Sequence, residues 1–438
     1  MHSLNKNRII KTISAHVYGQ ALNFLIAIFI PSVLVRNWGV DGFGYWVTLL
    51  AVSQFFVISD LNVSVAMANQ LCMKSDRDVL GARLLVNKTL SVLFKKINIT
   101  LSFIFFISII SYFYFFVKYN SNQALLFSFS FMALASAFAF QPFLNVYMSI
   151  WRYLERNEVG IFLVNTTRLI ELCLLIAASQ MGFGLIFCSM TILLFKLITV
   201  IAILNHSKML LKKEGTYLKN FVLNDQTSNE VKMIKKASGG FTLISLSQQI
   251  MLNTPVIIIS ALLGSIPAAV FAASRTLSRV SLLPLSMILI SLNPEMTILA
   301  AQKNYKGLRH VVFVFSIVSF LSISLVNVGI LEFHESIENL WFKGKLILDY
   351  STLLVLCITS AVLSISQILS QSMSAINNTR RQGKLYLMIY LSMALVIYSS
   401  VFYTKNILWV SFFSLLSEMI ILIFLFLEYR KNYLLNYS

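Results

Sequence analysis

Apolar runs of about 20 residues follow one another from Ser14 to Leu427, roughly twelve in all. A helix of that length crosses the ~30 Å hydrocarbon layer of a bilayer. Only 12% of the residues are charged and 58% are hydrophobic, which leaves too little polar surface for a water-soluble globule. The sequence therefore predicts an all-α integral membrane protein. Its function is to be sought in what crosses a membrane or is processed within it.

The apolar runs predict spans at residues 14–34, 44–68, 91–117, 124–149, 160–178, 183–204, 239–262, 266–292, 310–331, 349–373, 385–404 and 407–427. Most of the 35 lysines and arginines fall in the two tails and in alternate connections, including the long loop from Asn205 to Ser238. Cytoplasmic segments of membrane proteins carry this excess, so we expect both termini in the cytoplasm. The net charge of +18 then reflects topology and attraction to anionic lipid heads, and we expect no nucleic-acid partner.

The long loop divides the chain into a first lobe at 1–204, a linker at 205–238 and a second lobe at 239–438. Several residue types recur about 225 positions apart, such as Gly39 with Gly264 and, within one residue, Pro31 with Pro255. Six spans per lobe make the two lobes run in the same direction. Parallel repeats of this kind predict two six-helix lobes around a central cavity, which is the architecture of a carrier.

Polar stripes support the repeat and mark the expected cavity wall. They recur at helical spacing on the first, fourth, seventh and tenth spans. Gln54, on the second span, occupies the position equivalent to Arg279 on the eighth. The polar candidates for binding cargo are Gln20, Asn23, Gln54, Gln141, Gln248, Gln249, Gln367 and Gln371.

Arg275 and Arg279 are one helical turn apart near the middle of the eighth span. A charge at that depth costs roughly 3 kcal/mol, so it requires a partner, water or a function. Two guanidinium groups on one face would suit a phosphate-bearing ligand, because the planar fork pairs with phosphate oxygens and stays charged when buried. The alternative is that both arginines pair with acidic residues or helix ends and serve only the packing of the lobes.

Four other charged residues within spans need an explanation. Asp60 and Glu418 have no close partner in the sequence, so each could titrate or bind a cation during transport, or form a static pair with a cavity arginine. Arg168 and Glu171, at i and i+3 on the fifth span, are interpreted as an internal ion pair. Lys196 is expected to extend toward the cytoplasmic interface. Pro142, Pro284 and Pro255 are expected to kink their helices.

The sequence contains no nucleotide-binding glycine loop, no nucleophile elbow and no metal-ligand spacing. We therefore expect no cofactor, no metal and no enzymatic activity. A membrane glycosyltransferase or O-antigen polymerase would need catalytic groups in substantial outer loops, whereas the outer connections here are mostly short. A purely structural subunit remains a further alternative.

The stretch from Pro31 through Arg36, Gly39 and Phe43, followed by Asp60-Leu61, resembles the opening signature of polysaccharide exporters of the multidrug/oligosaccharidyl-lipid/polysaccharide (MOP) superfamily. Leu263-Gly264 with Ala272-Ala273-Ser274-Arg275 is similar to the echo of that signature in the family's second half. The resemblance extends over the whole chain and is nearest to the O-antigen flippases. Asn62 departs from it, because the family usually has Gly after Asp-Leu, and this weakens any role carried over to Asp60.

The resemblance implies a two-lobed carrier of the bacterial inner membrane. Its cargo would be polyprenyl-diphosphate-linked oligosaccharide, moved from the cytoplasmic to the periplasmic leaflet with an ion gradient as energy source. A polysaccharide polymerase and a chain-length regulator would be its partners. The family's cationic cavity would fall on Arg275 and Arg279. A multidrug exporter of the same superfamily is the first alternative, although its often cationic cargo would favour an acidic cavity.

Overall fold

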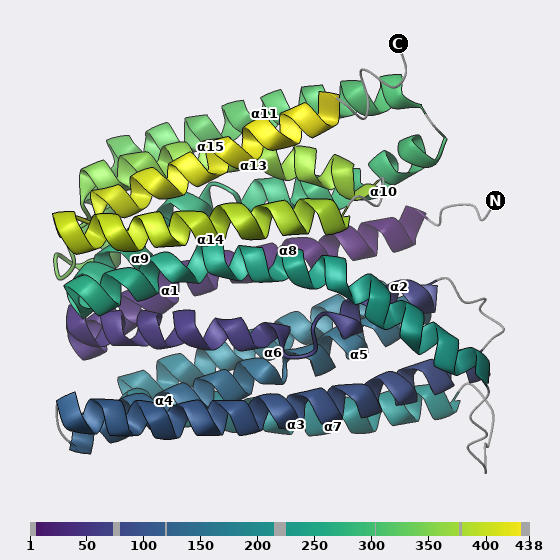
Figure 1. Ribbon diagram of the computed structural model, residues 1–438, viewed down its shortest axis with the longest axis horizontal. Coiled ribbons are helices and arrows are strands. Elements are labelled where there is room, and N and C mark those ends of the chain that lie inside the picture. Colours follow the sequence, from purple (N-terminus) through teal and green to yellow (C-terminus); the bar gives the residue numbers. More distant parts are fainter. Residues whose placement is uncertain are drawn as a thin grey trace. The chain divides into compact units, whose positions relative to one another are not determined.

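The computed structural model describes residues 6–72, 79–118, 121–213, 225–302, 304–375 and 379–430, and these form helices and no strands (Figure 1). The first half contains α1 (Lys6–Ser53), a short 3-10 helix η1 (Gln54–Ile58), α2 (Val63–Cys72), α3 (Val79–Lys118), α4 (Ser121–Ala139), α5 (Gln141–Tyr153), α6 (Asn157–Gln180) and α7 (Leu185–Lys213). The second half contains α8 (Asp225–Leu263), α9 (Ser265–Val280), α10 (Leu283–Ala301), α11 (Tyr305–Glu332), α12 (His334–Phe342), α13 (Tyr350–Ala375), α14 (Thr379–Thr404) and α15 (Leu408–Arg430). The predicted all-α membrane fold is confirmed.

Each predicted span falls on one helix or on consecutive helices that are separated by a break. Within the described ranges, 10 helices are long and apolar enough to cross a membrane. The count is lower than predicted for two reasons. The 48 residues of α1 would measure about 72 Å as one straight helix, more than twice the bilayer core, so α1 holds two spans that meet at Gly39. The eighth span is divided between α9 and α10, and each is short by itself.

Three predicted spans are interrupted, and the sequence explains each interruption. Pro142 and Pro284 lie in the first turns of α5 and α10, where a missing N–H is tolerated, so they mark breaks between helices rather than kinks within one. Pro255 lies inside α8, and the kink expected there stays a prediction. The second span is interrupted by the turn at Leu61 and Asn62, which both have positive φ. The tenth span has no proline and forms the continuous helix α13.

The backbone conformation at Gly39 and Gly264 supports the internal repeat. Gly39 has φ 74° and ψ 178°, and Gly264 has φ 103° and ψ −178°. This region of backbone space is essentially restricted to glycine. Pro31 and Pro255 each lie inside the helix that leads to one of these glycines. The same Pro-helix-Gly turn is therefore built twice, and the sharp reversal explains the glycine at each position.

The chain forms two compact units, which are described separately. The first comprises Met1–Leu22 and Val52–Ser245, and the second comprises Asn23–Ala51 and Leu246–Ser438. Residues 23–51 therefore pack with the C-terminal half, a placement that the expected division at 204 and 239 does not include. That division into lobes and a linker stays a prediction, and residues 214–224 of the expected linker lie outside the described residues.

The segment 23–51 is fixed closely within the second unit. Gly44 lies against the backbone of Ser265, so close that a Cβ at position 44 would fall 2.0 Å from the Ser265 carbonyl oxygen. The Ser265 hydroxyl donates a hydrogen bond to Asp41, and Trp341 Nε1 donates one to the carbonyl of Ile28 at 2.6 Å. A side chain at position 44 would abolish this contact between the two glycine turns.

Helix α13 is the centre of the second unit. It packs against α9, α10, α11 and α15, and 72% of its most apolar stretch is buried, compared with 22% for α11. The aliphatic core beside it includes Val256, Phe271, Leu356 and Val410. Most polar residues of α13 are buried, including Ser360, Ser364 and Ser366, so they face the interior of the unit rather than lipid.

Candidate functional site

A polar pocket lies inside the second unit, between α8, α9, α13, α14 and α15. It consists of two adjoining cavities that share Met251, Leu252, Arg279, Leu363 and Tyr390. The more polar of the two has a volume of about 240 Å³. We call the two cavities together the central pocket. Its polar wall comprises Gln248, Gln249, Thr254, Arg275, Ser278, Arg279, Thr359, Ser360, Ser366, Gln367, Ser370, Tyr386, Tyr390, Ser414, Ser417 and Glu418.

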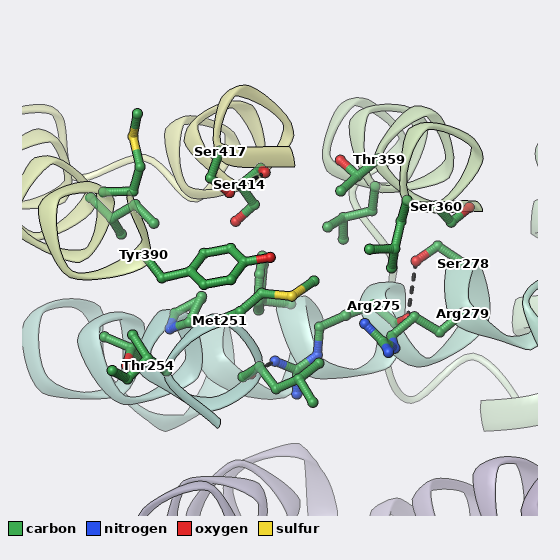
Figure 2. A pocket seen from close by; sticks show the side chains of 18 of the residues that line it. Met251, Thr254, Arg275, Ser278, Arg279, Thr359, Ser360, Tyr390, Ser414 and Ser417 are labelled. Carbon is green, nitrogen blue, oxygen red and sulfur yellow. Dashed lines mark hydrogen bonds between the residues drawn. The ribbon is translucent and has the colours of Figure 1, made fainter. Parts of the chain in front are cut away.

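Arg279, near the end of α9, lines both cavities and is partly buried. Figure 2 shows it on the same pocket wall as Arg275, facing the space that Tyr390 also enters. Among the residues that the structure describes, the Arg279 guanidinium makes no direct hydrogen bond or ion pair, and its charge interacts at longer range with Glu418 and Tyr390. Guanidinium carries five N–H donors and keeps its charge in proteins. Arg279 therefore presents a cation with unused donors to the pocket.

Arg275 is engaged differently, although it lies one turn away on the same helix. Its guanidinium donates a hydrogen bond to the carbonyl of Leu252 on α8, and it lies 5.8 Å from the centre of the Phe271 ring. Leu252 is three residues before Pro255, whose ring and missing N–H disturb the hydrogen bonding of this turn. Arg275 thus holds α9 to the disturbed turn of α8, while Arg279 is left to face the pocket.

Glu418 on α15 also lines the central pocket and is 1% exposed. Its Oε1 accepts a hydrogen bond from the Tyr390 hydroxyl at 2.7 Å. Its Oε2 is buried and has no hydrogen-bond partner in the described part of the chain. Arg279 lines the same cavity and its charge interacts with that of Glu418, although no direct ion pair joins the two side chains in the described part of the chain. Both expectations for Glu418, ion coupling and a static pair with a cavity arginine, stay predictions.

A polar network continues from Tyr390 along α14. Gln382, Tyr386 and Tyr390 are spaced four residues apart, so they lie on one face of the helix. The Gln382 side-chain amide donates to the Ser370 hydroxyl and to the Tyr386 hydroxyl, the latter at 3.0 Å. This column gives the pocket hydroxyl and amide groups at several depths.

The structure brings some of the predicted polar candidates together and separates others. Gln248, Gln249 and Gln367 line the central pocket with Arg279 and Glu418. Gln371 lies one turn farther along α13 and is not part of its wall. Gln20, Gln54 and Gln141 belong to the first unit, and Asn23 belongs to the second. A role in cargo binding stays a prediction for all of these residues, those in the pocket wall included.

Asp60 has a local structural contact that the sequence did not reveal. It is 2% exposed, and its two carboxylate oxygens accept backbone N–H bonds from Asn62 at 3.0 Å and from Ser64 at 2.7 Å. Those N–H groups lie at the start of α2, where a carboxylate satisfies unpaired donors and the helix dipole. Asp60 therefore caps α2, and an ion-coupling role for it stays a prediction.

The expected ion pair of Glu171 with Arg168 is wrong, because Glu171 pairs with Lys196 at 2.5 Å instead. Helices α6 and α7 form an antiparallel hairpin, and residues 171 and 196 lie at nearly equal distances from its turn. Their side chains are 19% and 7% exposed, respectively. The expected extension of Lys196 toward the interface is wrong for the same reason, since its ammonium is held inside the hairpin.

Sequence reasoning missed Tyr390, Tyr386 and Gln382, although a signal was available. Tyr386 and Tyr390 are four residues apart on the eleventh span, and Gln382 comes four residues before Tyr386, which marks a polar face that a lipid-exposed helix would not need. Their significance depends on Glu418 and Ser370, which come from other helices. Only the fold shows that these groups meet.

The structure of this chain is similar over nearly its whole length to solved structures of membrane transporters. The chain is similar to a multidrug resistance MATE-family transporter of the MOP superfamily in its inward-facing conformation, with 16% identity, a TM-score of 0.63 and coverage of 96% of this chain and 94% of that one. The outward-facing form of such a transporter gives 16% identity, a TM-score of 0.61 and coverage of 98% and 96%. The fold is that of MOP-superfamily transporters.

A third similar structure is a MOP-superfamily transporter from Pyrococcus furiosus, described as having a binding pocket of reverse polarity that suggests a different function. It shares 16% identity with this chain, has a TM-score of 0.62, and the similarity covers 97% of this chain and 95% of that one. No protein-family model matches the sequence, and no curated protein matches it. The fold of MOP-superfamily transporters is shown by the structural similarity, and the 10 apolar helices support a multi-pass membrane protein.

Proposed function

We propose that this protein is a flippase that carries polyprenyl-diphosphate-linked oligosaccharide units across the bacterial inner membrane, from the cytoplasmic to the periplasmic leaflet. One observation carries the proposal, namely the Arg279 guanidinium, which faces the central pocket with N–H donors that no described residue accepts. A buried cation of this kind is costly unless an anion or water completes it. A diphosphate headgroup supplies that anion.

The remaining wall of the central pocket suits the rest of such a cargo. Sugar hydroxyls exchange hydrogen bonds with serine, tyrosine and glutamine side chains, and Gln248, Gln367 and Tyr386 offer these groups beside Arg279. Moving a diphosphate and sugars through hydrocarbon would cost their hydration, and a polar pocket replaces part of it. The apolar polyprenyl chain has no such cost and can remain in the lipid.

The charge of the pocket favours this cargo over the alternative within the same fold. Multidrug exporters are among the similar structures, so export of drugs is the second candidate. The Pyrococcus furiosus transporter indicates that pocket polarity can differ within the fold. Here two arginines and one glutamate line the central pocket. That balance favours an anionic ligand over a cationic one.

Ion coupling belongs to the same proposal. Glu418 lies in the central pocket, hydrogen-bonded only through Oε1 to Tyr390, so its other oxygen can take a proton or contact a cation while the cargo is exchanged. Asp60, the other candidate, is engaged at the start of α2. We further propose that both termini are cytoplasmic, as the distribution of lysine and arginine indicates.

The test is a flipping assay with purified protein in liposomes that contain a fluorescent polyprenyl-diphosphate disaccharide. A membrane-impermeant reagent that destroys the fluorescence reports how much lipid is in the outer leaflet. Protein-containing vesicles are expected to expose the whole lipid pool, while protein-free vesicles expose about half. A parallel assay follows the loss of a cationic dye under a proton gradient. Dye transport without lipid flipping would refute the flippase and support the multidrug exporter.

A further inference from the structure

A second cavity of the second unit lies on a different face of α13 from the central pocket. It is formed where α11, α13 and α15 run side by side (Figure 1) and has a volume of about 580 Å³. We call it the flank groove. Helix α13 presents Leu363, Ser366 and Gln367 to the central pocket, but Ile365 and Leu369 to the flank groove. The groove is therefore a separate site.

The flank groove is apolar along most of its length and open to the surroundings. Phe313, Leu321 and Phe426 in its wall are 66%, 60% and 54% exposed. In a membrane-spanning helix such side chains face lipid, so the groove opens toward the hydrocarbon of the bilayer. Its volume is in the range of specific ligand sites. Hydrocarbon is the chemistry that fits its walls.

A smaller apolar cavity of about 310 Å³ adjoins the flank groove. The two share Ile365, Leu369 and Phe426, and the smaller one continues past Leu422 and Ile423 on α15. Two apolar channels thus meet at Phe426. A lipid with two acyl chains fits this arrangement better than a single-chain lipid.

One end of the flank groove is basic. Arg309 and His310 lie at the start of α11, and Tyr429 lies at the end of α15. Arg309 Nε donates a weak hydrogen bond to the Tyr305 carbonyl at 3.4 Å, and its terminal amino groups have no hydrogen-bond partner in the described chain. Glu428, which precedes Tyr429 at the end of α15, is paired with Arg381 at 2.6 Å, and no ion pair joins it to Arg309 in the described chain. This end of the flank groove therefore offers the Arg309 guanidinium to an anionic group.

A polar atom lies between the basic end and the apolar channels. Ser316 lines the flank groove two turns from Arg309, about 10 Å along the helix, and its Oγ is buried without a hydrogen-bond partner in the described chain. Diacyl lipids carry ester carbonyls at the junction of headgroup and chains. The Ser316 hydroxyl can donate to such a carbonyl.

We propose that the flank groove binds an anionic phospholipid of the leaflet at the end of the bundle where α11 begins and α15 ends. The phosphate pairs with Arg309 beside Tyr429, an ester carbonyl accepts from Ser316, and the acyl chains occupy the two apolar channels that meet at Phe426. Guanidinium–phosphate pairing gives the site its preference for anionic heads. The site is independent of the cargo pocket and of the proposed function.

The test measures lipid binding by the full chain in detergent. Phosphatidylglycerol and phosphatidylcholine with identical chains are added separately, and the unfolding temperature and the bound lipid, by native mass spectrometry, are recorded. Phosphatidylglycerol is expected to raise the unfolding temperature by about 3 °C or more and to remain bound, while phosphatidylcholine is not. Arg309→Gln should remove the difference. The matched control Lys306→Gln, which removes a charge at the same end outside the groove wall, should keep it.

A second variant tests the groove itself rather than the charge. Ile317→Trp fills the apolar channel while Arg309 is unchanged, so bound phosphatidylglycerol should fall at least about tenfold. Equal binding of both lipids, equal losses in the Arg309 and Lys306 variants, or full binding by Ile317→Trp would each overturn the proposal. So would preferential retention of an added polyprenyl phosphate over phosphatidylglycerol, because the occupant would then be a different lipid.

Discussion

Replacing Arg279 with Gln is expected to slow flipping of the polyprenyl-diphosphate lipid by about 10- to 100-fold. The estimate follows from the loss of charge-assisted hydrogen bonds to phosphate, worth about 1.5–3 kcal/mol, where 1.4 kcal/mol corresponds to a factor of ten. The Arg279 guanidinium makes no direct hydrogen bond or ion pair with another described side chain, and its interaction with the charge of Glu418 is at longer range, so the protein should reach normal abundance. The initial rate in the liposome flipping assay is the measurement.

Two control variants make this result specific. Lys405→Gln removes an exposed cation at the end of α14 and should leave flipping unchanged. Arg275→Gln removes the hydrogen bond to Leu252, so its main effect should be a lower unfolding temperature. Flipping at the wild-type rate by Arg279→Gln, at normal abundance, would exclude Arg279 from the cargo site.

The second large effect is expected on stability, at the ion pair of Lys196 and Glu171. Lys196→Met should lower the free energy of unfolding by about 3–5 kcal/mol, because it leaves the carboxylate of Glu171 buried without its cation. The double variant Lys196→Met with Glu171→Gln should recover much of that loss, since it removes both charges. Denaturant or thermal unfolding in detergent measures both quantities.

Arg168→Met is the matched control for this pair. It removes the cation that is nearest to Glu171 in sequence but is not bonded to it, so it should change the unfolding free energy by less than about 1 kcal/mol. If Arg168→Met and Lys196→Met were equally destabilising, or if the double variant were no better than Lys196→Met, the observed pairing would be contradicted.

The sequence was a good guide to the fold because membrane crossing leaves a local mark. Every predicted span is helical, and Pro142 and Pro284 lie at the helix starts where their spans are broken. Gly39 and Gly264 were found by a recurring residue type, and their shared backbone conformation gives the physical reason. These features depend on neighbours in sequence, so sequence alone could reveal them.

The candidate site was only partly predictable because its contacts join distant helices. Depth and spacing placed Arg275 and Arg279 together on one helix, but not the Leu252 carbonyl that engages Arg275 alone. Sequence proximity suggested Arg168 for Glu171, whereas the hairpin brings Lys196. Tyr390 is recognised as part of the site only because its hydroxyl donates to Glu418, 28 residues away. Contacts of this kind are set by helix packing rather than by local pattern.

The central claim is that the pocket at Arg279 takes a diphosphate. Its most direct test is calorimetric titration of the detergent-solubilised protein with a short-chain polyprenyl diphosphate, beside a polyprenyl amine of the same chain length. The diphosphate is expected to bind at one site, more weakly at high salt and at least about tenfold more weakly to Arg279→Gln. Tighter binding of the amine, lost in Glu418→Gln and unaffected by Arg279→Gln, would contradict the account.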